Sequence, residues 1–222
     1  EDISNILTLP FNDVQALEGA FRRYPGQIAG IIGTPYHHPA MADNVLPQPG
    51  FWQAVRSLCD REGTVLIIDD VRAGFRLSLH GSDAYYGFEA DLICFCKALG
   101  NGHNLSALCG KDALREAVSS VFYTGSYWLS AVPMAAALAT LNEMERLDGA
   151  RLMLDLGTKL TTGLTKVAQQ HGYHLKISGE PSMWYMRLTD DDSGVLHQRW
   201  VGECVRRGVF SPTTTTCSST PP

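Results

Sequence analysis

The chain has 222 residues, of which 45% are hydrophobic and 18% charged, as in an ordinary globular protein that can bury a sizeable core in one or two domains. Its formal net charge of −5 argues against nucleic acid or an anionic membrane surface as partner. No apolar run is long enough to span a bilayer and no signal peptide opens the chain, so we expect a cytoplasmic protein without a membrane partner.

The first elements alternate between helix and strand. Apolar residues at helical spacing predict a helix over residues 13–24, which Asn12 caps and Pro25-Gly26 ends. Residues 27–33 predict a buried strand, and residues 51–61 a second helix. A turn at 62–63 then leads into the next apolar run. Helix, turn and strand repeated in this order are typical of an α/β fold with a mostly parallel sheet.

The loop that follows the first strand contains His37 and His38. In open α/β sheets, ligands bind beyond the carboxyl ends of the strands, so this loop can border a site. Two histidines can bind a metal, but a closed metal site needs further ligands, and the sequence offers no third one nearby. We therefore expect a surface or substrate-lining loop here and no metal.

Two apolar runs each end at one charged residue. Residues 65–68 lead to Asp69, and residues 92–96 lead to Lys97. Continuous apolar runs of this length predict strands that are buried on both faces of a parallel sheet. A carboxylate and an amine at two such strand ends can share one crevice. This combination suits a pyridine cofactor, because an aspartate can keep the ring nitrogen protonated while a lysine forms a Schiff base with an aldehyde.

Both charged residues also have a simpler interpretation. Asp69 could be only a strand-end cap, and Lys97 could extend its amine to water, as lysines at strand ends commonly do. Two features favour chemistry at Lys97. Five apolar residues precede it, and Gly100 and Gly102 follow it, where backbone can approach a ligand closely. A lysine held away from water is also more nucleophilic at neutral pH.

The six cysteines follow neither a disulfide nor a zinc spacing, which favours reduced thiols in a cytosolic type of protein. Cys94 and Cys96 would share one face of a strand. We interpret them as small core residues, and the alternative, a metal site, would need further ligands nearby.

The run Ile68–Arg76 (IDDVRAGFR), the pair Asp91-Leu92 and the run Lys97–Gly100 (KALG) resemble the class III pyridoxal-phosphate aminotransferases, and most closely their glutamate-1-semialdehyde 2,1-aminomutase-like branch. The resemblance extends from about Leu7 to about Phe210. It implies the pyridoxal-phosphate-dependent transferase fold (fold type I), in which a mostly parallel sheet forms the large domain and an α+β small domain follows. It also implies pyridoxal 5'-phosphate as the cofactor.

The resemblance assigns a role to four residues. Lys97 would be the Schiff-base residue, Asp69 would hold the ring nitrogen, and Val71 would pack on one face of the ring. Ser126 stands where the family has a threonine that reaches the cofactor phosphate of the partner subunit, which implies a homodimer with shared active sites. Ser126 keeps the hydroxyl donor in front of a helix, but a helix cap or a local turn is an equally good interpretation.

The sequence departs from the family pattern at several places. The family usually has glutamate where Thr34 and Asp70 stand, and it favours proline and glycine where residues 103–106 stand. Arg76 matches the pattern, and we interpret it as structural. The family's turn that cradles the cofactor phosphate and the aromatic residue that stacks on the ring have no match before Asp69. The chain therefore resembles a fragment of the family.

The second half of the chain predicts helices and short strands that resemble a partial small domain. We predict helices over residues 112–120, 133–147, 150–171 and 195–207, and strands over 106–110, 173–177 and 182–188, with another beginning at Gly208. The third helix carries an apolar stripe that we predict to be buried: Leu152, Leu156, Leu160, Leu164 and Val167.

The domain organisation follows from these elements. Residues 1–140 would form the C-terminal part of the large cofactor-binding domain, and residues 141–210 a partial small domain. Residues 211–222 have no apolar pattern, so we interpret them as disordered or as the product of a shifted reading frame.

The sequence therefore predicts a transaminase that transfers an amino group from an amine or amino acid to a carbonyl acceptor through a Lys97 Schiff base. Two alternatives stay open. An aminomutase would use the same residues, and a truncated, non-catalytic α/β fragment would use none of them. The residues that would define the substrate lie mostly outside this sequence.

Overall fold

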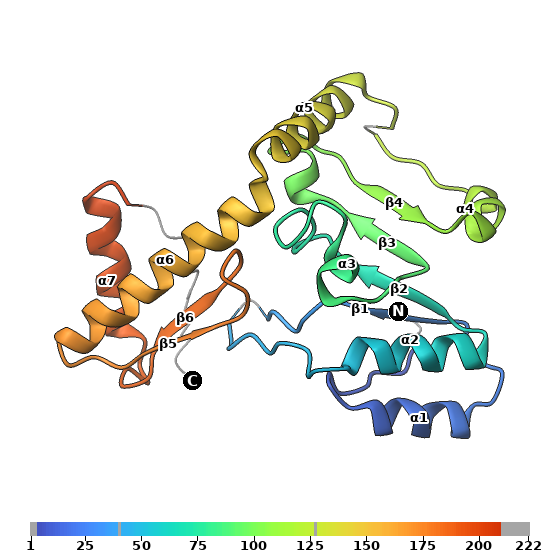
Figure 1. Cartoon of the computed structure of the whole chain (residues 1–222), viewed down its shortest axis with the longest axis horizontal. Coiled ribbons are helices and arrows are strands. Elements are labelled where there is room, and N and C mark those ends of the chain that lie inside the picture. Colours follow the sequence, from blue (N-terminus) through green and yellow to red (C-terminus); the bar gives the residue numbers. More distant parts are fainter. Residues whose placement is uncertain (1–3, 40, 127, 210–222) are drawn as a thin grey trace. The chain divides into compact units, whose positions relative to one another are not determined.

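The computed structural model of the chain describes residues 4–39, 41–126 and 128–209. The chain divides into two compact units. The first comprises Pro47–Arg151 and the chain up to His37, and the second comprises His38–Leu46 and the chain from Leu152 onward. The first unit contains a four-stranded sheet and the second a two-stranded one (Figure 1). The predicted α/β fold with a mostly parallel sheet is confirmed, whereas the domain boundary at residue 140 stays a prediction.

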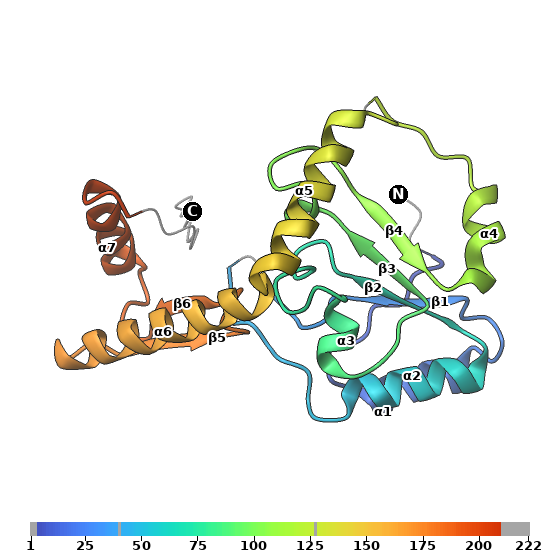
Figure 2. The ribbon, with the colours of Figure 1, turned by 45° about the horizontal axis from the view of Figure 1, so that its top comes forward.

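The four-stranded sheet has its strands in the order in which they occur along the chain, β1-β2-β3-β4 (Figure 2). The first three strands are parallel, and β4 runs antiparallel to β3. The carboxyl ends of β1, β2 and β3 therefore lie at one edge of the sheet. The strands are β1 (Gly30–Gly33), β2 (Val65–Asp69), β3 (Leu92–Phe95) and β4 (Ala107–Gly110).

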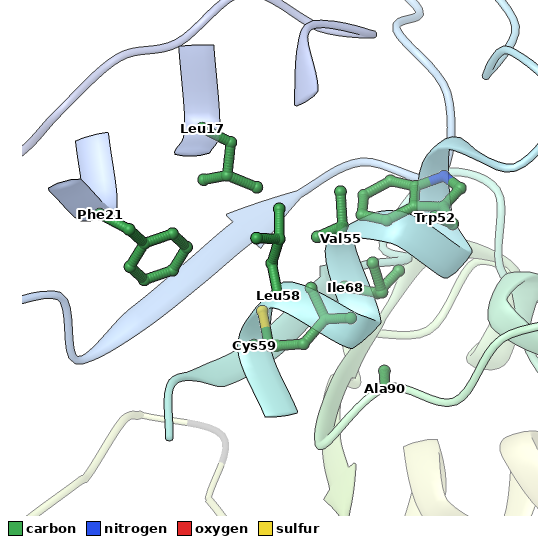
Figure 3. Packing of buried hydrophobic residues seen from close by; sticks show 9 residues of the cluster. Leu17, Phe21, Trp52, Val55, Leu58, Cys59, Ile68 and Ala90 are labelled. Carbon is green, nitrogen blue, oxygen red and sulfur yellow. The ribbon is translucent and has the colours of Figure 1, made fainter. Parts of the chain in front are cut away.

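Two helices, α1 (Val14–Arg23) and α2 (Phe51–Glu62), pack with the sheet into one hydrophobic core (Figure 3). Trp52 of α2 stacks on Phe88 with ring centroids 4.9 Å apart. Burial of a large apolar side chain stabilises a fold by roughly 1.5–3 kcal/mol, so this core fixes how α1 and α2 cover the sheet. Its buried members are Leu17, Phe21, Trp52, Val55, Leu58, Cys59, Leu66, Ile68 and Ala90.

The strands are less buried than the sequence predicted. β1 is an edge strand of the described sheet, and Ile32 is 66% exposed. In β2, Leu66 and Ile68 are fully buried, but Ile67 between them is only half-buried. The reason is that the core formed with α1 and α2 covers one face of β2, so the strand alternates where the sequence predicted burial on both faces.

The start of α1 also differs from the prediction. Asp13, and not Asn12, caps the helix, since its side chain accepts a hydrogen bond from the N–H of Ala16 at 2.8 Å. Asn12 has a φ of +67°, and its side-chain oxygen accepts the N–H of Gln48 at 2.9 Å. Two adjacent residues that can both cap a helix are not distinguished by local pattern alone.

The remaining helices of the first unit are α3 (Ser82–Tyr86), α4 (Arg115–Ser120) and α5 (Ala131–Leu147). The helix α3 was not predicted, because it spans five residues and is too short to show helical periodicity. The predicted helix over 112–120 is present as a 3₁₀ turn, Asp112–Leu114, followed by α4. Ser130 is the N-cap residue of α5, so this helix begins two residues earlier than predicted.

The second unit contains most of α6 (Gly149–Gln170), the antiparallel pair β5 (Leu175–Ser178) and β6 (Tyr185–Leu188), and α7 (Val195–Arg206). The predicted buried stripe of α6 is wrong. Leu164 is half-buried, and the other four residues of the stripe are between 44% and 56% exposed. The helix instead buries Gly157, whose backbone approaches the carbonyl oxygen of Pro181.

The segment His38–Leu46 belongs to the second unit, which the sequence did not predict. Asp43 binds both Arg187, at 2.9 Å, and Lys176, at 2.6 Å. The bond from the Arg187 guanidinium lowers the pKa of Asp43. The backbone N–H of Asn44 donates to the hydroxyl of Ser178 at 2.9 Å. These contacts fasten the segment to the β5–β6 pair.

The predicted strand from Gly208 and the tail fall largely outside the described residues, which exclude Phe210, Cys217 and the rest of 210–222. Within the described ranges, none of the helices combines the length and apolar character that crossing a membrane would require.

Candidate active site

Asp69 and Lys97 lie at the same edge of the sheet. Asp69 is the last residue of β2, and its Cα is paired with that of Cys94 in the neighbouring parallel strand. β3 ends at Phe95, and Lys97 follows two residues later. Since ligands of open α/β sheets bind beyond the carboxyl ends of the strands, the fold positions both residues where a ligand would be expected.

The carboxylate of Asp69 is oriented by the backbone that follows it. Its Oδ1 accepts the N–H of Val71 at 3.2 Å, and both residues are half-buried. Burial raises the pKa of the Cys94 thiol, and the negative charge of the nearby Asp69 raises it further. The carboxylate therefore lies beside β3, and Val71 is held next to it by the same turn.

Lys97 has an unusual backbone conformation. Its φ is +40°, a left-handed conformation that residues other than glycine rarely adopt. The residues on either side hold it there, since Phe95 and Leu99 are buried in a second core with Phe75 and Ala137. Strained backbone of this kind persists only where packing enforces it, and it is found preferentially at functional sites.

The side chain of Lys97 is exposed in the described chain, contrary to our expectation of a lysine held away from water. The apolar run before it predicted a buried environment. However, β3 ends at Phe95 and Lys97 opens a 3₁₀ turn, Lys97–Leu99, so the burial of the strand does not extend to this side chain. Its amine is accessible to a ligand.

Asp70 holds the loop after β2, a role that the sequence did not indicate. Its carboxylate is fully buried and accepts both the N–H of Ser82 at 2.9 Å and the hydroxyl of Ser82 at 2.5 Å. Burial raises the pKa of Asp70, although the Ser82 bonds oppose this shift. Asp70 and Ser82 are twelve positions apart, and no signal in the sequence would pair them.

Ser126 belongs to a different segment from the other three predicted site residues. It is exposed and lies in a turn before α5, and Ser130 occupies the N-cap position that Ser126 was an alternative candidate for. The segment that leads from α4 to α5 runs beyond β4, past the edge of the sheet (Figure 2). A role for Ser126 toward a second subunit stays a prediction.

The loop after β1 is fixed by hydrogen bonds. Trp52 donates its indole N–H to the carbonyl of Pro35 at 2.7 Å, and the Thr34 hydroxyl donates to the carbonyl of Tyr36 at 2.9 Å. Tyr36 is fully buried. Among the residues that the structure describes, histidine, cysteine and acidic side chains do not gather in groups that could hold a metal ion.

The residues at this edge fit pyridoxal phosphate. The group needs a carboxylate for its ring nitrogen and an amine for its aldehyde, and the structure offers Asp69 and an accessible Lys97 at the ends of neighbouring parallel strands. The half-buried Val71 beside Asp69 adds an apolar surface of the kind that a flat ring packs against.

Comparison with protein families gives one match over nearly the whole chain. The model of the aminotransferase class-III family matches residues 7–221. Among curated proteins, an aminopentol aminotransferase from Sphingopyxis macrogoltabida is 38% identical over 200 residues, which are 90% of this chain and 47% of that protein. A 3-aminobutyryl-CoA aminotransferase from Cloacimonas acidaminovorans is 30% identical over 93% of this chain and 51% of its own length. The chain thus spans about half the length of these relatives.

Solved structures agree with the family match. The internal aldimine form of the FumI protein from Sphingopyxis sp. MTA144, which contains pyridoxal phosphate, is 37% identical and superimposes with a TM-score of 0.88 over 93% of this chain and 50% of that one. A β-phenylalanine aminotransferase from Variovorax paradoxus shares the fold, with 23% identity and a TM-score of 0.77 over 93% of this chain and 51% of its own.

Proposed function

The chain belongs to the class III aminotransferases, and from this premise we propose that it forms part of a pyridoxal-phosphate-dependent transaminase. The reaction would transfer an amino group from an amine or amino acid to a carbonyl acceptor. The observation that carries the proposal is the shared sheet edge, where β2 ends at Asp69 and Lys97 follows the neighbouring parallel strand β3.

The chemistry of the cofactor would depend on four residues of this chain. Pyridoxal phosphate, when bound, supplies an electron-accepting ring that stabilises negative charge on the amine-bearing carbon of the substrate. Lys97 would hold the cofactor by its aldehyde carbon, and, once the incoming amine has displaced it, the freed Lys97 amine would move a proton at the substrate carbon. Asp69 accepts a hydrogen bond from the protonated ring nitrogen, Val71 packs on one ring face, and the Ser126 hydroxyl binds the phosphate held by a second subunit.

A homodimer is part of this proposal, because the Ser126 role requires a second subunit. It is supported by large apolar side chains that lie exposed around Ser126 and along α5. Such a concentration of exposed apolar surface marks an interaction site more often than a free surface. The six most exposed are Val121, Phe122, Tyr123, Leu129, Val132 and Leu138, at 64% to 92%.

The proposal also includes a cytoplasmic location and a domain division. The five cysteines in the described ranges are free thiols, which is typical of a reducing compartment. Residues 1–140 would belong to the large cofactor-binding domain and residues 141–210 to a small domain. The segment His38–Leu46 would then lie within the large domain by its position in the sequence, although it packs with the second unit.

Two other functions stay in competition. An aminomutase of the glutamate-1-semialdehyde type would use Lys97 and Asp69 in the same way and differ only in its substrate. A non-catalytic fragment is favoured by one observation, namely that the chain spans 47% of an aminotransferase to which it is 38% identical.

The test is reduction with borohydride, which converts a Schiff base into a stable adduct. The full chain is mixed with pyridoxal phosphate, its absorbance is recorded before and after reduction, and the labelled lysine is identified by peptide mass spectrometry. We expect one adduct, on Lys97, that is absent from Lys97→Ala and unchanged in Lys159→Ala, since Lys159 is an exposed lysine of α6.

An adduct spread equally over surface lysines, or none, would refute the proposal and favour the non-catalytic fragment. If the adduct forms on Lys97, single-turnover transfer from an amine to a keto acid then distinguishes a transaminase from an aminomutase, which would act only within one molecule.

A further inference from the structure

Asp70 anchors the backbone directly behind Asp69. Its N–H donates to the carbonyl of Cys94 in β3 at 3.0 Å, and its own carbonyl accepts the N–H of Gly74 at 2.8 Å. Its side chain is fully buried, and its two carboxylate oxygens accept the N–H and the hydroxyl of Ser82, the first residue of α3. The backbone at Asp70 is therefore fixed by β3, by the following turn and by α3.

The turn that follows Asp70 is packed too closely to shift on its own. A Cβ atom at Gly74 would lie 2.6 Å from the carbonyl oxygen of Asp70 and 2.8 Å from Cδ1 of Phe95, closer than non-bonded atoms approach each other. The ring centroid of the neighbouring Phe75 lies 4.7 Å from that of Phe95. Because Phe95 is the last residue of β3, these contacts fasten the turn after β2 to the strand that leads to Lys97.

Asp69 takes its orientation from this fixed backbone. It is half-buried, whereas Asp70 is fully buried, as expected of successive residues in an extended chain, whose side chains point to opposite sides. The N–H that donates to the Asp69 carboxylate belongs to Val71, on the other side of Asp70. A rotation of the backbone at Asp70 would therefore move both the carboxylate of Asp69 and its donor.

The bonds between Ser82 and Asp70 hold this arrangement against electrostatic repulsion. Burial raises the pKa of Asp70, and the negative charges of Asp83 and Asp69 raise it as well, whereas the two bonds from Ser82 lower it. The hydroxyl bond, at 2.5 Å, has the length of a strong hydrogen bond to a carboxylate. Ser82 thus supplies the contact that keeps a buried carboxylate next to Asp69.

We infer that the Asp70–Ser82 pair positions the Asp69 carboxylate against the ring nitrogen of pyridoxal phosphate. Asp70 and Ser82 would touch neither the cofactor nor the substrate, so they are positioning residues that act through Asp69. The inference rests on the proposed transaminase function, in which Asp69 accepts a hydrogen bond from the protonated ring nitrogen.

The test measures the pH at which the Schiff base on Lys97 loses its proton, from the absorbance of the full chain saturated with pyridoxal phosphate. A protonated ring nitrogen places positive charge near the Schiff-base nitrogen and lowers its pKa. In Ser82→Ala the hydroxyl donor is lost, so Asp69 should hold the ring proton less well. We expect the midpoint to rise by about one pH unit, as loss of one hydrogen bond to a charged group implies.

Two further variants separate positioning from stability. Thr64→Val removes a buried hydroxyl in front of β2, at the end opposite Asp69, where it donates to the carbonyl of Ile28 at 2.8 Å. This variant should lower the melting temperature without moving the midpoint. Asp69→Ala should raise the midpoint at least as much as Ser82→Ala does, and the double variant should match Asp69→Ala alone, because the pair acts only through Asp69.

A second measurement needs no cofactor. In the ¹⁵N-labelled chain, the amide cross-peak of Val71 reports its bond to Asp69. We expect Ser82→Ala to move this cross-peak toward its position in Asp69→Ala, and Thr64→Val to leave it in place. Asp70→Asn keeps the size of the side chain and removes the charge that Ser82 binds, so it should act like Ser82→Ala if that variant does not fold. Thermal unfolding shows which variants are folded.

An unchanged midpoint in Ser82→Ala would overturn the inference. So would effects of Ser82→Ala and Asp69→Ala that add in the double variant, or a Val71 cross-peak that does not move. If wild type forms the Schiff base on Lys97 and any of these results is found, this inference alone is refuted. If wild type forms no Schiff base, the proposed transaminase is refuted and this inference with it. A Val71 cross-peak that still moves would then show a pair that only fixes the turn.

Discussion

Gly100 determines how tightly the chain turns after Lys97. A Cβ atom at this position would collide with the carbonyl oxygen of His103, and backbone cannot move aside as a flexible side chain can. We expect Gly100→Ala to reduce the free energy of unfolding by about 1–3 kcal/mol, the usual cost of overpacking, and to reduce the yield of the Lys97 adduct. Chemical denaturation measures the first effect and borohydride trapping the second.

Gly125→Ala is the matched control for Gly100→Ala. A Cβ at Gly125 would meet no atom within 4 Å, so stability should change little. If both substitutions had the same small effect, the turn after Lys97 would not depend on this close approach.

Asp70 makes stability depend on pH in a direction opposite to that of most carboxylates. Because burial raises its pKa in the folded state, the folded chain binds more protons than the unfolded chain between the ordinary carboxyl pKa of 3.8 and the raised value. Stability from this group is therefore present at low pH and is lost as the pH rises through that window. Asp70→Asn cannot ionise, so we expect the variant to lack this loss.

The difference in unfolding free energy between Asp70→Asn and wild type isolates this contribution. It is measured in steps of about half a pH unit from about pH 3.5 upward, so that the series begins near the ordinary pKa of a carboxyl group. The carboxylates with lowered pKa, Asp43 and Asp91, are present in both proteins and cancel. A difference that does not vary with pH would show that the pKa of Asp70 is the same in the folded and the unfolded chain.

Substitutions at two glycines of α6 can separate the effect of helix propensity on stability from the effect of packing. Glycine in a helix interior costs about 1 kcal/mol relative to alanine. A Cβ at Gly163 would meet nothing within 4 Å, whereas one at Gly157 would overlap the carbonyl of Pro181. We expect Gly163→Ala to raise the free energy of unfolding by about 0.5–1 kcal/mol, and Gly157→Ala to lower it despite the same gain in propensity. Thermal and chemical denaturation of both variants measure this contrast.

Stabilisation by both substitutions would mean that α6 does not pack closely on the residue 179–183 loop.

The same helix shows what periodicity can and cannot predict. The apolar stripe placed α6 within a few residues of its true bounds, but it did not identify the buried face, because that face is defined by a glycine that allows backbone contact rather than by large side chains.

Elements with a strong local pattern were the ones that the sequence predicted well. The helix from Phe51 and the two strands that lead to Asp69 and Lys97 are present within one or two residues of their predicted bounds. Short or long-range features were not predicted. The five-residue helix α3 has no period to detect, and the packing of His38–Leu46 on β5–β6 depends on residues more than 130 positions away.

The candidate site, too, was predicted only in part from the sequence. Its position at the carboxyl edge of neighbouring strands follows from two apolar runs that each end in a charge. The exposure of Lys97 and the pairing of Asp70 with Ser82 both depend on where strands end and loops fold back. No local pattern encodes these. The roles of Lys97, Asp69, Val71 and Ser126 stay predictions until they are measured.

At the scale of the whole molecule, the proposed dimer predicts that exposed apolar residues near Ser126 hold two copies together. Phe122 is 92% exposed, so Phe122→Ser should leave the melting temperature unchanged at concentrations where the chain is monomeric. Burial of one phenylalanine contributes roughly 1.5–3 kcal/mol, so the dissociation constant should rise about tenfold or more. Sedimentation equilibrium measures it, and Val195→Ser, at an exposed site on α7, should have no effect.

A chain that is monomeric at all concentrations, with or without Phe122, would contradict the dimer. The exposed apolar side chains would then be surface that the remaining half of a longer aminotransferase covers.

The order of the strands has a consequence for how the chain acquires its structure. Each strand of the first sheet pairs with the strand before it in the sequence, so β2 can join β1, β3 can join β2 and β4 can join β3 without waiting for residues that come later. During synthesis, the sheet edge with Asp69 and Lys97 can therefore form while α6 and α7 are still being translated. Formation of this edge would be vectorial, proceeding from the N-terminus as the chain leaves the ribosome.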